Sequence, residues 1–166
     1  APTTSTILTM ALGDALAVSL MEQRDFKPDD FKVLHPGGNL GLQMLTVSQL
    51  MRSKSEMAIV KDDLPMSDVV SSMTETGFGV AVLVDKKGIL SGVITDGDLR
   101  RNINQILTFS PRDIATLNPT SVKPADLVSV ALEKMEKFKV YAIVVEEEDR
   151  PVGLLRMHDV LRSGIK

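Results

Sequence analysis

From Val47 onward, short apolar runs and amphipathic stretches alternate along the chain, and the first round of this pattern covers residues 57–103. Residues 57–60 (MAIV) and 80–84 (VAVLV) are rich in β-branched side chains and too short for helices, which is typical of buried strands. A helix is predicted between them, because apolar residues recur at the spacing i, i+3, i+4 and i+7: Met66, Val69, Val70 and Met73. After a DKKG turn, residues 89–95 predict a return strand that leads directly into a charged closing helix, DGDLRRNI.

The second round repeats the same order of elements. A short strand is predicted at 120–122, followed by a helix at 127–138 that is expected to turn four apolar residues inward: Leu127, Val130, Ala131 and Met135. Residues 141–145 and 151–156 predict two further strands, separated by a polar turn. Residues 157–165 (MHDVLRSGI) predict the last helix.

The two rounds are copies of one unit, because similar residues recur at an interval of about 61 to 62 residues: Met73 with Met135, Val82 with Ile143, Gly92 with Gly153 and Asp98 with Asp159. Each copy predicts a β-α-β-β-α unit with a mixed sheet and its helices on one side, so the fold class is α/β (α+β). A unit of about 60 residues is only marginally stable by itself. We therefore expect the two sheets to pack against each other about a pseudo-twofold axis.

Residues 3–26 predict one long helix with almost no polar face. A helix that is apolar all round is normally buried inside a larger domain. We therefore expect residues 1–45 to be the end of a truncated domain followed by a turn-rich linker, because Pro and Gly cluster near residues 36–41. Residues 46–107 and 108–166 are then the two copies.

Composition narrows the possible functions. The chain is 43% hydrophobic and 25% charged, which supports a packed core, and its net charge of −3 argues against a broad nucleic-acid surface. An uninterrupted apolar run of about 18 to 20 residues is absent from the sequence, so no membrane association is expected. The chain has no cysteine and only two histidines, far apart in sequence, so no metal site is predicted. These features are consistent with a cytoplasmic protein.

The strand-to-helix junction of the first copy carries the strongest candidate site. A strand that ends in Thr95 and enters a helix brings a hydroxyl close to free backbone N–H groups, which suits a phosphate. Asp98, one turn later, can accept hydrogen bonds from sugar hydroxyls, and Gly97 permits close approach. Arg100 is a candidate phosphate neighbour or a solvated surface residue. The alternative for Thr95 and Asp98 is purely structural, since both are favourable at the start of a helix.

The second copy keeps the aspartate, Asp159, but has Arg156 where the first copy has threonine. An arginine can grip a phosphate through its fork of donors, yet it is also bulky enough to fill the pocket of a base or ribose. His158 is a candidate ligand contact, a pH-sensitive group or an ordinary residue of the helix start. The two sites are therefore expected to be unequal.

These endings, GVITDGD and GLLRMHD, resemble the CBS motif, and two in tandem resemble a CBS pair (Bateman module) over residues 47–166. The preceding segment, with GDALAVSL and HPGGNLG, is similar to the end of the sugar-isomerase (SIS) domain of bacterial arabinose-5-phosphate isomerases. The combination resembles that family as a whole. Its enzymes interconvert ribulose 5-phosphate and arabinose 5-phosphate, and they supply the acidic eight-carbon sugar of lipopolysaccharide or capsule.

The resemblance implies roles for single residues. Thr95 matches the family's phosphate-contacting threonine and Asp98 its ribose-contacting aspartate. His35 matches the histidine of the family's HPGG motif, which serves proton transfer, although Leu34 stands where serine is common. The family's other catalytic groups lie upstream of Ala1. We therefore expect the parent protein to be an aldose–ketose isomerase, with no required cofactor, and this chain alone to be inactive.

Two functions compete at this point. In the first, the CBS pair binds a nucleotide or nucleotide-sugar, either AMP or ATP or the cytidylyl-activated acidic sugar, and regulates an enzyme that acts on a sugar phosphate. In the second, the CBS pair serves only assembly and binds no ligand. The resemblance implies a homodimer of CBS pairs, and a homotetramer in the parent enzyme.

Overall fold

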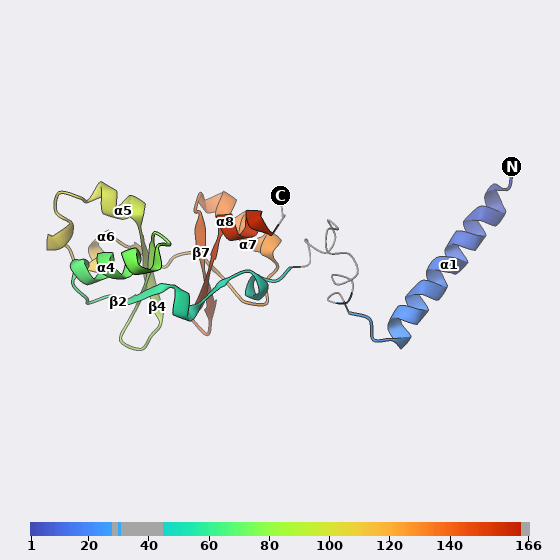
Figure 1. The fold of residues 1–166 in the computed structure, drawn as a ribbon, viewed down its shortest axis with the longest axis horizontal. Helices are drawn as coiled ribbons and strands as arrows, with labels where there is room; N and C mark the ends of the chain where they lie inside the picture. Colours follow the sequence, from blue (N-terminus) through green and yellow to red (C-terminus); the bar gives the residue numbers. More distant parts are fainter. Residues whose placement is uncertain (28–29, 31–44, 164–166) are drawn as a thin grey trace. The chain divides into compact units, whose positions relative to one another are not determined.

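A computed structural model describes residues 1–27, 30 and 45–163. The chain divides into two units, Ala1–Gly41 and Leu42–Lys166. The first unit contains helix α1 (Thr3–Gln23), and within that unit none of its side chains is buried (Figure 1). With 21 residues and a mean hydropathy of 1.4 over its most apolar window, α1 is long and apolar enough to cross a membrane by length and composition alone. The core helix of a soluble protein passes the same test.

The second unit contains both copies. The first copy begins with the 3-10 turns η1 and η2 and continues through the elements that the pattern predicts: η1 (Val47–Gln49), β1 (Arg52–Ser53), η2 (Lys54–Glu56), β2 (Ala58–Lys61), α4 (Met66–Thr76), β3 (Val80–Val84), β4 (Leu90–Thr95) and α5 (Asp96–Arg101). A connection with two short helices leads to the second copy: η3 (Ile106–Thr108), α6 (Pro111–Ile114), β5 (Thr116–Leu117), β6 (Ser121–Val122), α7 (Val128–Phe138), β7 (Ala142–Glu147), β8 (Arg150–Arg156) and α8 (Met157–Arg162).

The strands form two four-stranded sheets in the orders β2-β3-β4-β5 and β1-β8-β7-β6. The first strand of each copy therefore lies in the sheet of the other copy, because β1 pairs with β8 and β5 pairs with β4. The pairs β2–β3 and β6–β7 are parallel and the others are antiparallel, which confirms the predicted mixed sheets. The exchange therefore joins the two copies through backbone hydrogen bonds.

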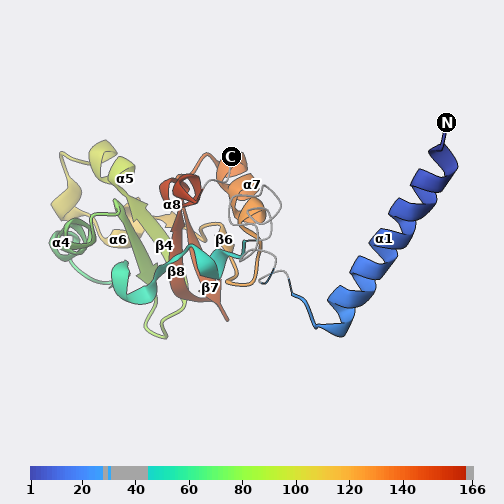
Figure 2. The same ribbon diagram turned by 45° about the vertical axis from the view of Figure 1, so that its right-hand side comes forward.

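Three apolar clusters form the interior. One lies between the first sheet and its helices around Met66 and Met73, and the second lies at the equivalent place in the other copy around Val128 and Met135. The third cluster joins the two sheets: Met57, Val82, Val144 and Leu154, with partly buried neighbours that include Phe78 and Val93. The helices thus lie outside and the sheets face each other, as Figures 1 and 2 show. This confirms the expected packing of the two sheets against each other.

The structure corrects two details of the repeat. Val82 pairs with Val93 and Val144 pairs with Leu154, so Val82 corresponds to Val144 and not to Ile143. The interval is 62 residues (144 − 82) on one strand of the hairpin and 61 (154 − 93) on the next, because the two hairpin turns differ in length. In α7 the buried face consists of Val128, Ala131 and Met135, whereas Leu127 and Val130 are about 40% exposed.

Candidate functional site

Thr95 ends β4 with an extended backbone and is the N-cap of α5. The Asp98 carboxylate accepts hydrogen bonds from the Thr95 amide at 2.8 Å and from the Thr95 hydroxyl at 2.6 Å, and this pair forms a capping box. The aspartate side chain is only 9% exposed. The structure therefore brings Thr95 and Asp98 together and shows the helix-capping role that the sequence allows.

One oxygen of Asp98 faces outward. The Asp98 Oδ1 atom accepts a hydrogen bond from Arg101, whose side chain is 70% exposed. Gly97 lies beside this arginine, since a Cβ atom at Gly97 would stand 3.3 Å from the guanidinium of Arg101. Arg100, which precedes Arg101 on α5, is also exposed. An exposed surface arginine is thus the group that holds this oxygen of Asp98.

Gly92 has a role that the sequence did not indicate. A Cβ atom there would stand 3.2 Å from the backbone oxygen of Thr116, which belongs to the exchanged strand β5. At the equivalent Gly153, a Cβ atom would stand 2.7 Å from the backbone oxygen of Arg52 on β1. Both glycines therefore make room for the exchanged strands.

The second copy places a different set of groups around its aspartate. Arg156 donates to both carboxylate oxygens of Asp159, at 2.7 and 3.0 Å. Arg52, from the exchanged strand β1, donates to the same two oxygens at 2.9 and 3.4 Å. The aspartate side chain is 8% exposed. Two bidentate arginines therefore saturate this carboxylate, and both are charge-assisted contacts.

An aromatic ring completes the arrangement. The guanidinium of Arg156 lies 4.0 Å from the ring centre of Phe78, and that of Arg52 lies 6.0 Å from it. Phe78 comes from the first copy, between α4 and β3. The hydrogen bonds from Arg156 and then those from Arg52 hold the pKa of Asp159 well below its usual range. We call Arg52, Phe78, Arg156 and Asp159 the Asp159 clamp.

Sheet register explains why Arg52 reaches the site. Arg52 lies opposite Leu154 on β8, and Arg156 is two residues further along the same strand. Residues two apart on a strand point to the same face, so the two arginines are diagonal neighbours. In the first copy, Thr116 lies opposite Val93, two residues before Thr95, and so occupies the position of Arg52. The strand exchange reveals Arg52, and the packing of the two sheets reveals Phe78; the repeat pattern gave no signal for either.

The other predicted residues are placed less centrally. His158 is exposed in the first turn of α8. His35 lies outside the described residues, so its predicted catalytic role stays a prediction. Within residues 1–27, 30 and 45–163, the structure contains no group of three or more His, Asp or Glu side chains that could hold a metal ion.

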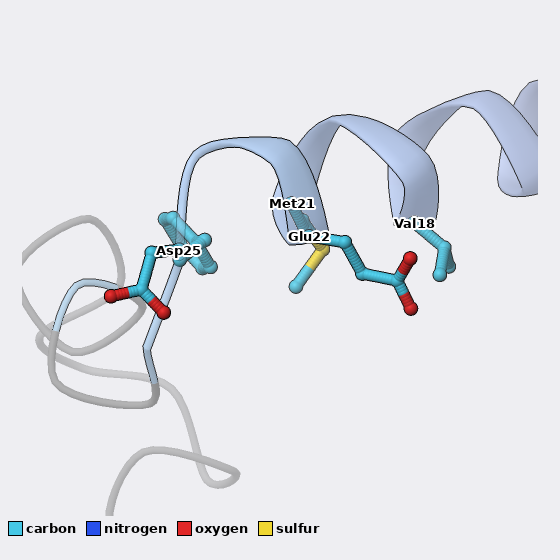
Figure 3. Close-up of a pocket in the computed structure, with 5 residues that line it drawn as sticks. Val18, Met21, Glu22 and Asp25 are labelled. Carbon is cyan, nitrogen blue, oxygen red and sulfur yellow. The ribbon is translucent and has the colours of Figure 1, made fainter.

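Two surface hollows accompany these elements. One, of about 440 Å³, lies at the end of α1 in the first unit and is lined by Val18, Met21, Glu22, Asp25 and Phe26. Figure 3 shows the first four of these side chains. The other, of about 240 Å³, lies where α4 and α5 meet next to Thr95, and its lining is mainly apolar: Val70, Met73, Thr74, Gly77, Gly79, Asp96 and Leu99. Asp96, which lies between Thr95 and Asp98 in sequence, thus lines an apolar hollow. The residues that line the hollow on α1 include none of the predicted site residues.

Comparison with known proteins agrees with this geometry. Residues 47–105 and 112–166 match the CBS domain family. Over 99% of its length the chain is 39% identical to arabinose 5-phosphate isomerase KdsD of Pseudomonas aeruginosa, and it spans about half (52%) of that relative. Solved structures with the same fold include CBSX2 in complex with AMP (TM-score 0.65, 21% identity, 72% of this chain and 95% of that one).

A further solved structure is the CBS domain pair of protein MJ0100 in complex with 5′-methylthioadenosine and S-adenosyl-L-methionine (TM-score 0.66, 19% identity, 72% of this chain and 94% of that one). At such identities these two structures support the fold alone. The match of both copies to the family, together with the two exchanged sheets, shows that the chain belongs to the CBS domain family as a tandem CBS pair, similar along nearly its whole length to arabinose 5-phosphate isomerases.

Proposed function

We propose that this chain is the regulatory CBS pair of an arabinose 5-phosphate isomerase, and that it binds a nucleotide or nucleotide-sugar at the first copy. The observation that carries the proposal is the junction of β4 and α5. It presents a hydroxyl on Thr95 and a carboxylate on Asp98, and among the described residues only the exposed Arg101 holds the Oδ1 atom of that carboxylate. When Arg101 moves into solvent, the carboxylate becomes available to sugar hydroxyls and the arginine to a phosphate.

The ligand class follows from this chemistry and from the neighbours. A hydroxyl at a helix start favours a phosphate, and a carboxylate favours paired hydroxyls, so a ribose phosphate satisfies both groups. The two similar folds carry adenine nucleosides or nucleotides in their crystals, which supports AMP or ATP as ligands. The cytidylyl-activated acidic sugar is the competing candidate, because it contains the same ribose phosphate and would be the end product of a pathway that starts from arabinose 5-phosphate.

The N-terminal unit supports the isomerase assignment. The match to the isomerase includes α1, since it covers 99% of the chain. We infer that α1 packs inside the SIS domain of the parent protein, which explains its apolar surface without a membrane and agrees with a cytoplasmic enzyme. In that parent, His35 would serve proton transfer between adjacent sugar carbons. Conversion of ribulose 5-phosphate by the isolated 166-residue chain would contradict the expectation that this chain alone is inactive, since one histidine cannot perform the isomerisation.

A thermal-shift panel tests ligand binding. AMP, ATP, CMP and the cytidylyl-activated sugar are added separately to the chain. A ligand that binds only the folded state raises the Tm, because at a concentration of 100 times its Kd it adds about 2.7 kcal/mol to the free energy of unfolding. The double variant Thr95→Val/Asp98→Ala is expected to abolish the shift. A normal shift in this variant would contradict the proposed site.

The matched control removes the same kind of cap elsewhere. Ser110 and Asp113 form a capping box at α6, with the serine hydroxyl donating to the carboxylate at 2.7 Å. The variant Ser110→Ala/Asp113→Ala loses a comparable cap, so its own Tm falls, but its ligand-induced shift is expected to equal that of the unmodified chain. The two variants together separate loss of ligand binding from loss of helix stability.

Assembly is the second candidate function, and a surface of the second copy favours it. Val130 and Phe138 on α7 and Leu161 on α8 are 39%, 51% and 58% exposed. Such a surface suits a second CBS pair, giving a homodimer of pairs and a homotetramer in the parent enzyme. Absence of any Tm shift across the panel, with a dimeric mass in sedimentation, would favour assembly over ligand binding.

A further inference from the structure

The two aspartates of the repeat, Asp98 and Asp159, differ in how firmly neighbouring side chains bind their carboxylates. Asp98 is bound by its own capping threonine and by one arginine that is 70% exposed. Asp159 is bound by two arginines that are 36% and 21% exposed, and each of them contacts both of its oxygens. To reach Asp159, a ligand would have to break four hydrogen bonds to charged groups, whereas at Asp98 a single surface side chain has to move.

The charges within the second site are already balanced. Arg52 also contacts Glu56 at 3.3 Å, so two guanidinium groups face two carboxylates. A phosphate entering this site would find no net positive charge to attract it. The Phe78 ring adds to this, because it lies 4.0 Å from the Arg156 guanidinium and so covers a face of that arginine.

We infer that the Asp159 clamp closes the second site, because Asp159 binds Arg156 and Arg52 instead of a ligand. The CBS pair therefore binds one nucleotide per chain. The same contacts fix the segment that leads from the first unit onto the second copy, because Arg52 lies on β1 and pairs with β8. The first copy thus binds the ligand, and the second copy holds strand β1.

The structure also indicates how to open the second site. The first copy has Thr95 and Thr116 at the positions of Arg156 and Arg52. The variant Arg52→Thr/Arg156→Thr therefore gives the second site the polar groups of the first. The control variant is Arg112→Thr, which removes an arginine from another ion pair, with Asp62 at 3.3 Å, outside both sites.

Isothermal titration with AMP measures the number of ligands per chain, and this part of the test depends on the proposed function. We expect one AMP per chain for the unmodified chain and for Arg112→Thr, and two for Arg52→Thr/Arg156→Thr. Two AMP per chain without any substitution would overturn the inference. So would a double variant that folds and still binds only one.

A second measurement needs no ligand. Arg52→Gln, Asp159→Asn and the combined variant are unfolded in urea, and the midpoints are compared as a double-mutant cycle. Arg52→Gln is expected to lower the midpoint clearly in the unmodified chain and by less than half as much in the Asp159→Asn background. Equal shifts in both backgrounds would show that the clamp does not hold β1. If AMP fails to bind at all, nucleotide binding of that type is wrong, and this cycle alone decides the clamp.

Discussion

The two copies share a backbone and differ in what they do with the same aspartate. Both have a mixed four-stranded sheet, an exchanged first strand and a glycine that admits it. At the strand-to-helix junction, however, the first copy has two threonines and an aspartate held by an exposed arginine, whereas the second has two arginines that saturate its aspartate. A duplicated fold thus supports one site built from hydroxyl groups and an ion pair to an exposed arginine, and another in which two arginines pair with the aspartate. Matched substitutions in the two copies test this difference, because they should change the stability of the chain by different amounts.

The largest difference is expected from the glycines that admit the exchanged strands. In Gly153→Ala the new methyl group would stand 2.7 Å from a backbone oxygen of β1, while in Gly92→Ala it would stand 3.2 Å from a backbone oxygen of β5. The first substitution forces the backbone apart and should cost about 2–3 kcal/mol, and the second about 1 kcal/mol. Urea unfolding of both variants measures this.

Because Arg52 is carried by β1, Gly153→Ala should also loosen the Asp159 clamp. Amide hydrogen exchange at Arg52, which lies opposite Leu154 on β8, is expected to accelerate in Gly153→Ala and to stay unchanged in Gly92→Ala. Equal stability losses in the two variants would contradict the assignment of the tighter strand contact to the second copy.

The next largest effect is expected from acid. The folded-state pKa of Asp159 is depressed by Arg156 and Arg52, so its contribution to stability is fully present above the unfolded value of about 3.9 and is lost as pH falls through the folded-state pKa. Between pH 5 and pH 2 the unmodified chain should therefore lose about 1–2 kcal/mol more than Asp159→Asn, which has no carboxyl to protonate.

Urea unfolding at several pH values gives this comparison. The lowered pKa values of Asp85 and Asp113, which have no partner in the Asp159 clamp, contribute equally to both proteins and cancel in the difference. Arg52→Gln provides the intermediate case, since it leaves Arg156 on the carboxylate. Parallel pH profiles for the unmodified chain and Asp159→Asn would show that the clamp adds nothing to stability.

The sequence predicted the repeated core well because that core depends on local periodicity. Met66, Val69 and Met73 recur at helical spacing and are all buried, and the strand at 80–84 agrees with β3. The prediction of the buried face of α7 was partly wrong. Leu127 and Val128 are adjacent apolar residues, and only tertiary packing determines that Val128 is the buried one.

The candidate site was predicted only where it is local. Thr95 and Asp98 are three residues apart, so a capping pattern finds both. Arg52 and Asp159 are separated by 107 residues and meet through the exchange of β1, which no periodicity or motif encodes. Phe78 was hidden for the same reason, since its partner is in the other copy. Contacts between copies require the register of the sheets.

The smallest expected effect concerns the residues that end α4 and α7. Gly77 and Lys139 both adopt the left-handed conformation, with φ of 65° and 55°. A side chain disfavours this region, so Lys139→Gly should stabilise the chain by about 0.5–1 kcal/mol and Gly77→Lys should destabilise it by about 1 kcal/mol. Lys139→Ala controls for the loss of charge, because it removes the ammonium group without easing the backbone, and it should leave stability nearly unchanged. If Lys139→Ala stabilises as much as Lys139→Gly, charge and not backbone strain distinguishes the second copy at this position.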